Sequence, residues 1–153
     1  MKTCCFTGHR EVKEPDLLRE RIKSAITSLI EQGVTDFYDG GAIGFDQLCG
    51  ETIIELKNQY SFIKLYLLLP CPPYEQTKYW SITQTEKYNE LLGAADDVTI
   101  LSEHYTSDCM KKRNAMLVEK ADCCVCYCGR QRSGTAQTVR MAYSKGIDVI
   151  NLF

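Results

Sequence analysis

The sequence predicts an open, doubly wound α/β fold in which a mainly parallel sheet is flanked by helices. Short apolar segments alternate with longer amphipathic ones, and the hydrophobic period changes from two to about 3.6 residues at glycine-containing loops. Parallel strands need crossovers of a dozen or more residues, which helices supply. No repeat or linker interrupts the 153 residues, so we expect a single domain spanning residues 1–153.

The first strand and the first helix are marked by their boundary residues. Residues 2–7 form a short apolar run that Gly8 ends, which indicates a strand. Pro15 suits the first turn of a helix, because its missing N–H would have no partner there. The helix at 16–32 carries its apolar residues on one face, and Gly33 stops it.

The next three elements repeat the pattern around a glycine-rich loop. Residues 35–38 form a second strand, and a helix with one apolar stripe follows at 44–59. Residues 63–69 are apolar on both faces, as in a strand covered on both sides. The prolines within 70–73 end this strand.

The second half of the chain continues the alternation of strands and helices. The expected elements are a helix at 79–92, a strand at 98–101, a helix at 108–120, a strand at 123–128, a helix at 135–145 and a strand at 149–153. In a doubly wound sheet the ligand site lies outside the carboxyl ends of the strands, where successive crossovers diverge to opposite faces. The strand-to-helix loops are therefore where we expect the functional residues.

The composition excludes several classes of protein. Hydrophobic residues make up 44% and charged residues 25% of the chain, close to the averages of globular proteins, so it is neither disordered nor fibrous. A net charge of −2 offers no broad basic surface for sequence-independent binding to duplex DNA. No apolar run approaches the roughly 20 residues of a membrane helix, and the start is too polar for a signal peptide. We therefore expect a cytoplasmic protein without a membrane partner.

The nine cysteines are expected to be reduced thiols, because their number is odd and a cytosolic compartment keeps thiols unpaired. Cys124, Cys126 and Cys128 alternate on one face of a predicted strand, which is unlike the ligand spacing of structural zinc sites. We interpret them as small core residues and predict no metal site. Cys71 lies in a loop and is expected to be an exposed thiol without a partner base.

Three strand-to-helix loops carry unusual residues and are expected at the same edge of the sheet: Thr7–Arg10, Asp39–Asp46 and Gly129–Thr135. Two of them lead directly into helices, whose N-termini offer unpaired N–H groups and a partial positive charge. Phosphate is therefore the first ligand group that we expect. The glycine spacing matches neither the dinucleotide fingerprint nor a P-loop, which disfavours ordinary NAD binding and ATP hydrolysis.

Each predicted site residue has a role in binding a phosphorylated sugar. Backbone N–H groups and a hydroxyl would surround the phosphate, two arginines, Arg10 and Arg113, would neutralise it, and the Asp46 carboxylate would hold a ribose hydroxyl. The predicted ligand-binding residues are Gly8, His9, Arg10, Gly40, Gly41, Ala42, Asp46, Arg113, Asn114, Ser133, Gly134 and Thr135. The candidate catalytic residues are Asp46, Arg113 and His9.

Each of these candidate residues also has an explanation that requires no ligand. Glycine is the default turn residue, so a tight turn explains the second loop equally well. Asp46 lies in a first helical turn, where the helix dipole favours a carboxylate without any further role. Arg113 follows two lysines, which is typical of a solvent-exposed cationic helix face. His9 and Arg10 are alternatively explained as a pair of surface residues. Two loop arginines, Arg130 and Arg132, are expected at the rim, and the sequence leaves open whether Tyr74 or Trp80 lines the pocket.

Five segments, in register over nearly the whole chain, resemble the YpsA-like family of uncharacterised proteins. They are Cys5–Arg10, Gly40–Asp46, Leu69–Pro72, Arg113–Met116 with Ala121 and Asp122, and Ser133–Thr135. This family belongs to the SLOG superfamily, whose Rossmann-like members include the DNA-processing protein DprA and the LOG-type phosphoribohydrolases. The resemblance implies a Rossmann-like fold, a nucleotide-derived ligand at the strand edge, and self-association.

The sequence departs from the catalytic pattern of the LOG-type enzymes. In those enzymes a Gly-Gly-x-Gly-Thr-x-x-Glu motif supplies a glutamate, and a helix arginine assists cleavage of the N-glycosidic bond of a nucleoside 5′-monophosphate. The resemblance places Gly134 and Thr135 on this motif and Arg113 at the arginine, but Thr138 stands in place of the glutamate. Glycosidic cleavage usually needs a carboxylate near the sugar cation, so an enzyme would have to use Asp46.

We therefore expect a protein that binds and senses a nucleotide or an ADP-ribose-like molecule, with no cofactor required. Occupancy would be passed to a partner or to a homo-oligomer of the chain. The alternative is a phosphoribohydrolase-like N-glycosidase acting on nucleoside 5′-monophosphates. Binding of single-stranded DNA, as in DprA, has less support, because the chain is acidic and lacks an appended winged-helix region.

Overall fold

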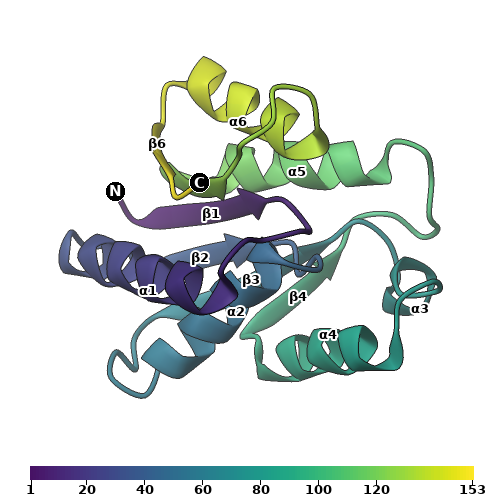
Figure 1. The fold of residues 1–153 in the computed structure, drawn as a ribbon, viewed down its shortest axis with the longest axis horizontal. Coiled ribbons are helices and arrows are strands. Elements are labelled where there is room, and N and C mark those ends of the chain that lie inside the picture. Colours follow the sequence, from purple (N-terminus) through teal and green to yellow (C-terminus); the bar gives the residue numbers. More distant parts are fainter.

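The computed structural model describes all 153 residues and contains one six-stranded sheet in the order β4-β3-β2-β1-β5-β6. The strands are β1 (Thr3–Gly8), β2 (Asp36–Asp39), β3 (Lys64–Leu69), β4 (Asp97–Ile100), β5 (Cys123–Tyr127) and β6 (Asp148–Asn151). Every neighbouring pair is parallel, and the paired residues include Cys5 with Tyr38 and Cys5 with Cys124. The predicted doubly wound α/β class is confirmed (Figure 1).

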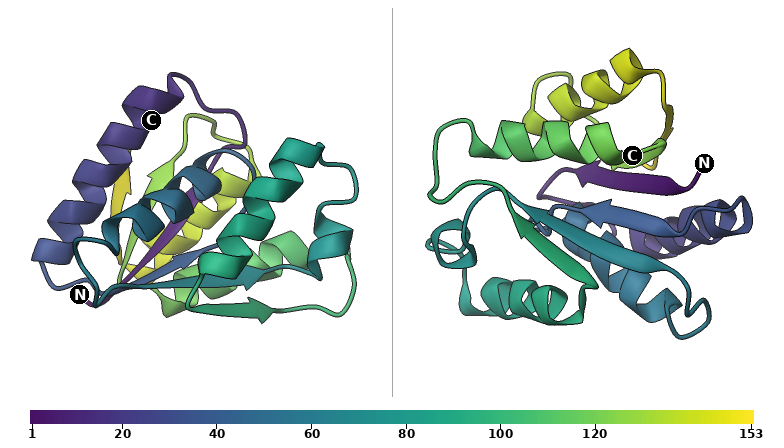
Figure 2. Two further views of the ribbon diagram at one scale, coloured as in Figure 1. Left: turned by 90° about the horizontal axis from the view of Figure 1, so that it is seen from below. Right: turned by 180° about the vertical axis from the view of Figure 1, so that it is seen from behind.

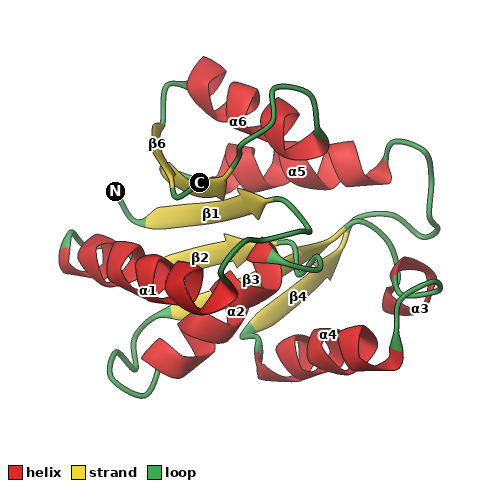
Figure 3. Ribbon diagram, viewed as in Figure 1, coloured by secondary structure: helices red, strands yellow, loops and turns green.

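Helices cover both faces of the sheet, as Figures 2 and 3 show. The helices are α1 (Pro15–Glu31), α2 (Phe45–Leu56), α3 (Pro73–Gln76), α4 (Ile82–Ala94), α5 (Cys109–Lys120) and α6 (Gly134–Lys145). Helices α1, α2 and α4 lie on one face, whereas α5 and α6 lie on the other (Figure 1). The chain therefore leaves β1 toward one face and β5 toward the opposite face, which makes the gap between these neighbours the switch point of the sheet.

Two core clusters hold the layers together. The larger packs the sheet against α1, α2 and α4, and the smaller lies between the sheet and α5 and α6. Cys4 belongs to the larger cluster and Cys5 to the smaller, because successive strand residues point to opposite faces. All nine cysteines are free and only Cys128 is not buried. The interpretation as core residues is confirmed for Cys124 and Cys126, whereas Cys128 is partly buried against the smaller cluster.

The structure differs from the sequence predictions between β3 and α4. The short helix α3 was not predicted, and α4 begins at Ile82 because Ser81 and Gln84 form a capping box. The prediction of an exposed Cys71 is wrong, since this thiol is completely buried. Its Sγ lies 4.0 Å from Oε1 of Gln76 in α3, and burial raises its pKa to about 11. The unpredicted helix is therefore one of the elements that cover it.

None of the helices has the length and apolarity that crossing a bilayer requires.

Candidate functional site

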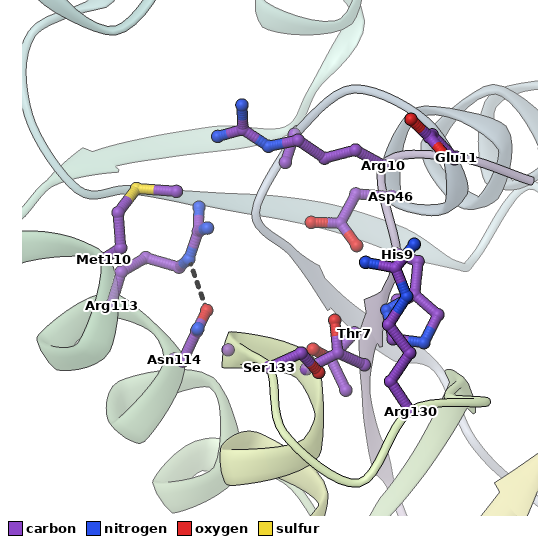
Figure 4. Close-up of a pocket in the computed structure, with 14 residues that line it drawn as sticks. Thr7, His9, Arg10, Glu11, Asp46, Met110, Arg113, Asn114, Arg130 and Ser133 are labelled. Carbon is purple, nitrogen blue, oxygen red and sulfur yellow. Dashed lines mark hydrogen bonds between the residues drawn. The ribbon is translucent and has the colours of Figure 1, made fainter.

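The loops that follow β1, β2 and β5 meet with the start of α5 around a cavity of about 430 Å³, here called the loop pocket (Figure 4). It lies at the carboxyl ends of β1 and β5, at the switch point of the sheet. Its lining residues are Thr7, Gly8, His9, Arg10, Glu11, Ala42, Asp46, Met110, Arg113, Asn114, Arg130, Ser133, Gly134 and Thr135. The three loops thus open at one edge, as the sequence predicted.

All the predicted ligand-binding residues except Gly40 and Gly41 line the loop pocket. The sequence reasoning did not assign site roles to Glu11 and Met110, and it placed Arg130 at the rim. The position of Glu11, directly after the His9–Arg10 pair, was the signal that could have identified it. Met110 lies one helical turn before Arg113, so the two share a helix face.

The structure places Gly40 and Gly41 behind the pocket wall, which corrects their predicted position. The carbonyl oxygen of Gly40 accepts a hydrogen bond from Nη1 of Arg113 at 3.0 Å. A Cβ on Gly40 would lie 2.5 Å from this nitrogen, so the glycine leaves room for the guanidinium. Gly41 has a φ of +71° and donates its N–H to Oδ1 of Asp39 at 3.4 Å. These glycines therefore serve internal packing around Arg113 and Asp39.

The loop after β1 packs closely against the start of α2 and is hydrogen-bonded to it. A Cβ on Gly8 would lie 2.4 Å from the ring of Phe45, and a Cβ on Gly44 would lie 2.2 Å from the carbonyl oxygen of Arg10. Phe45 also donates its backbone N–H to the carbonyl oxygen of His9 at 3.2 Å. These close contacts hold the His9–Arg10 pair beside the first turn of α2, where Asp46 lies.

The N-terminus of α6 remains open toward the loop pocket. Ser133 caps the helix, because its side-chain oxygen accepts the N–H of Ala136 at 3.0 Å. The amides of Gly134 and Thr135 donate no hydrogen bond within the chain. Apart from its chain neighbours and the backbone of its own helix, no part of the chain lies within 4 Å of where a Cβ on Gly134 would be. Two unpaired N–H groups at a positive helix end are suited to binding an anion.

His9 is buried and acts as a neutral side chain. Gly129 donates its backbone N–H to Nε2 of His9 at 2.9 Å, so this ring nitrogen is unprotonated and the proton of the neutral ring is on Nδ1. Burial and the nearby charge of Arg130 lower the pKa of His9. At neutral pH this histidine can donate a hydrogen bond from Nδ1, but it adds no positive charge to the loop pocket.

Two buried carboxyl groups lie at the base of the site. Burial raises the pKa of Asp46 to about 6, although the charges of Arg113 and Arg10 and the N–H of Ala42 oppose the shift. The Oδ1 atom of Asp46 has no hydrogen-bond partner. Asp39 is fully buried behind it, and burial together with the charge of Asp46 raises the pKa of Asp39 well above its usual value. Burial thus raises the pKa of both carboxyl groups, and Asp46 titrates at about pH 6.

Three arginines reach the loop pocket from different elements, as Figure 4 shows. Arg113 is buried, with hydrogen bonds to the carbonyl oxygen of Leu68 at 3.4 Å and to Oδ1 of Asn114 at 2.8 Å, in addition to that with Gly40. The solvated-face interpretation of Arg113 is thus wrong, and its side chain lines the loop pocket. Its role in binding an anion stays a prediction. Arg10 and Arg130 are exposed, and none of the three forms an ion pair with a carboxylate. Their charges remain available to an anion.

Comparison with protein families gives a match over most of the chain. Residues 4–147 match the model of YpsA, described as the YspA SLOG family. A UPF0398 protein, BH1768, of Halalkalibacterium halodurans is 32% identical over 107 residues, which are 69% of this chain and 56% of that protein. The SPbeta prophage-derived protein YoqJ of Bacillus subtilis is 26% identical over 148 residues, or 86% of this chain and 84% of YoqJ. The UPF0398 protein YpsA of the same organism is 24% identical, over 80% of this chain and 73% of YpsA.

Solved structures of DNA processing protein A have the same fold. The protein from Helicobacter pylori, whose single-stranded DNA binding mode has been described structurally, superposes with a TM-score of 0.69 and 15% identity. The protein from Streptococcus pneumoniae superposes with a TM-score of 0.70 and 14% identity. Nearly the whole chain is covered in both cases, but it spans only 64% and 50% of those two chains. At this identity the likeness concerns the fold alone.

Proposed function

The chain belongs to the YspA SLOG family (YpsA), and from this premise we propose that it binds and senses a nucleotide or an ADP-ribose-like derivative in the loop pocket. The observation that carries the proposal is the open N-terminus of α6. The free amides of Gly134 and Thr135 lie in the same cavity as three arginines that have no carboxylate partner. Helix N-termini and arginine guanidinium groups are both preferred donors to phosphate. No further cofactor is needed for this binding.

The start of α6, the three arginines and Asp46 each have a place in this proposal. The amides at the start of α6 hold the phosphate, and Arg10 and Arg130 close over it from the mouth. Arg113 is held in place by Gly40, Leu68 and Asn114, so its charge is fixed before the ligand arrives. Asp46 lines the pocket, and its carboxylate accepts a hydrogen bond from a ribose hydroxyl. Occupancy is then passed to a partner or to a second copy of the chain.

Isothermal titration calorimetry and thermal unfolding with AMP, ADP-ribose, ribose 5-phosphate and inorganic phosphate test the proposal. A ligand at 100 times its Kd adds about 2.7 kcal/mol to the free energy of unfolding. The matched variants are Arg130→Gln, which changes a pocket arginine, and Arg132→Gln, which changes an exposed arginine of the same loop that does not line the pocket. We expect the first to weaken binding about tenfold, since a charged hydrogen bond contributes about 1.5–3 kcal/mol, and the second to leave it unchanged.

Two results would contradict a phosphate-binding pocket. The first is the absence of any stabilisation or heat with all four compounds. The second is equal loss of affinity in the Arg130→Gln and Arg132→Gln variants. Salt-dependent binding of a thymidine oligonucleotide in the absence of nucleotide binding would instead favour a role in binding single-stranded DNA.

Asp46 supports a second candidate function, cleavage of the N-glycosidic bond of nucleoside 5′-monophosphates. A buried carboxyl group whose pKa is about 6 can exchange protons near neutral pH and can stabilise a sugar cation when ionised. Thr138 cannot replace it, because its hydroxyl donates to the carbonyl oxygen of Gly134 at 2.8 Å. Incubation with AMP, GMP and CMP, followed by chromatography for free base, tests this activity. Turnover that disappears in Asp46→Asn would favour the enzyme over the sensor.

A further inference from the structure

A second cavity of about 640 Å³, here called the aromatic cavity, adjoins the loop pocket. Arg10 and Met110 line both cavities, so the two share a wall. The other walls of the aromatic cavity come from α3, the start of α4 and the segment between β4 and α5. Both cavities have the volumes of small-molecule sites. The two cavities are therefore adjacent, with Arg10 and Met110 in the lining of both.

The aromatic cavity presents flat ring surfaces to solvent. The side chain of Tyr79 is 89% exposed and that of Tyr105 is 60% exposed, although both line a concave surface. Trp80 is half-buried, and its ring packs edge-on against buried Tyr88 with 5.1 Å between the centroids. This contact orients the indole without covering the whole ring. Exposed rings in a cavity offer stacking surfaces for a planar heteroaromatic group.

Two side-chain amides in the aromatic cavity provide hydrogen bonds for the edge of such a group. Gln76 is only 9% exposed, and its amide nitrogen has no partner within the chain. Gln84 uses its carbonyl oxygen to accept the N–H of Ser81 at 3.0 Å, which leaves its amide nitrogen free. Amide groups suit the ring nitrogens and carbonyl oxygens along the edges of nucleobases. The cavity thus combines stacking faces with edge donors.

The charge of the aromatic cavity also suits a nucleotide. Glu75 is the only acidic residue that lines it, and its carboxylate is paired with Nδ1 of His104 at 3.0 Å and with the N–H of Tyr105. Arg10 and Lys78 add positive charge without a carboxylate partner. An anionic group therefore meets no uncompensated negative charge within the aromatic cavity.

We propose that the aromatic cavity binds the heteroaromatic base of a nucleoside phosphate whose phosphate lies in the loop pocket, with Arg10 between the two ends. This inference rests on the proposed phosphate-binding function and specifies its ligand class. The base distinguishes a nucleotide from a sugar phosphate, which fills only the loop pocket. Stacking of the base on aromatic side chains makes a nucleotide bind more tightly than a sugar phosphate. The amides of Gln76 and Gln84 orient the base.

Trp80 is the only tryptophan of the chain, so intrinsic fluorescence reports directly on the aromatic cavity. We expect AMP and ADP-ribose to change the Trp80 emission and to bind at least tenfold more tightly than ribose 5-phosphate. Ribose 5-phosphate should bind, as calorimetry would show, without changing the emission. The calorimetric signal of ribose 5-phosphate therefore tests the loop pocket, and the dependence on the base tests the aromatic cavity.

Tyr79→Ala and Tyr74→Ala form a matched pair of variants. Both tyrosines are exposed, by 89% and 70%, but only Tyr79 lines the cavity, so neither change should unfold the protein. We expect Tyr79→Ala to weaken AMP binding about tenfold and to leave ribose 5-phosphate binding unchanged, whereas Tyr74→Ala should affect neither. Equal affinities for AMP and ribose 5-phosphate, with constant Trp80 emission, would overturn the base site and leave the phosphate pocket standing. The absence of all phosphate binding would overturn both proposals.

Discussion

The loop that leads into α2 and the first turn of α6 both contain glycine, yet the chain uses Gly40 and Gly44 in one way and Gly134 in another. In the loop before α2, Cβ atoms on Gly40 and Gly44 would collide with Arg113 and with the backbone of Arg10. At the start of α6, a Cβ on Gly134 would meet no other segment of the chain within 4 Å, whereas one on Gly129, in the loop before the helix, would lie 2.1 Å from the Phe153 ring. The first loop uses glycine to bring protein segments together. The start of α6 leaves backbone N–H groups facing a cavity.

The two helix N-termini differ accordingly. The carbonyl oxygen of His9 accepts the N–H of Phe45 at the start of α2, and Asp46 follows in the first turn. The first two amides of α6 have no such partner. Both helices carry a partial positive charge at this end. One end therefore lies beside a buried carboxyl group of the chain itself, whereas the other is free for the anion of a ligand.

Gly44→Ala should have the largest effect on stability. Its φ of +88° disfavours any side chain, and the added Cβ would lie 2.2 Å from a backbone oxygen that cannot easily move. We expect a loss of at least about 3 kcal/mol in the free energy of unfolding, measured by urea denaturation and circular dichroism. If Gly44→Ala lowers the free energy of unfolding as little as Gly134→Ala does, Gly44 is not closely packed against the backbone of Arg10.

Gly40→Ala should destabilise the protein through Arg113, by about 1–3 kcal/mol, because overpacking moves the guanidinium from its carbonyl partners. A double-mutant cycle with Arg113→Ala isolates this contact. We expect Gly40→Ala to have much less effect in the Arg113→Ala background, where the colliding group is absent. Additive effects of the two substitutions on the free energy of unfolding would contradict the contact.

Asp46→Asn should stabilise the protein at high pH. The folded pKa of about 6 lies above the ordinary value of 3.8, so the folded state binds more protons than the unfolded state between these values. The ionised Asp46 therefore lowers the free energy of unfolding as pH rises through this window, by up to about 3 kcal/mol above pH 6. We expect the stabilising effect of Asp46→Asn to be near zero at pH 3.5 and to reach its maximum by pH 8, as urea unfolding at both pH values would show.

Gly134→Ala should have the smallest effect on stability and a clear effect on binding. The added methyl group meets no other segment of the chain, so we expect the free energy of unfolding to change by no more than about 0.5 kcal/mol. Because Gly134 lines the loop pocket and carries one of the free amides, we expect the added methyl group to weaken binding of AMP about tenfold in calorimetry. If the Gly134→Ala variant binds AMP with unchanged affinity, the phosphate does not bind at the start of α6.

The sequence predicted the strands and most of the helices because their signals are local. Apolar periodicity, Pro15 and Gly33 act over one or two turns of chain, and the structure has helices and strands where they indicate. The short helix α3 was missed because its four residues carry no periodic signal. The burial of Cys71 was missed for the same reason, since α3 helps to cover it.

The sequence by itself determined the fold class, the edge of the sheet where the loops meet, and most of the residues around the loop pocket. Only the tertiary structure decided which glycines face protein and which face the cavity, because that depends on contacts such as those of Gly40 with Arg113 and Gly44 with Arg10. These partners are far apart in the chain, so no local pattern encodes them. Long-range packing likewise buried Arg113 and raised the pKa of Asp46 by removing both side chains from water.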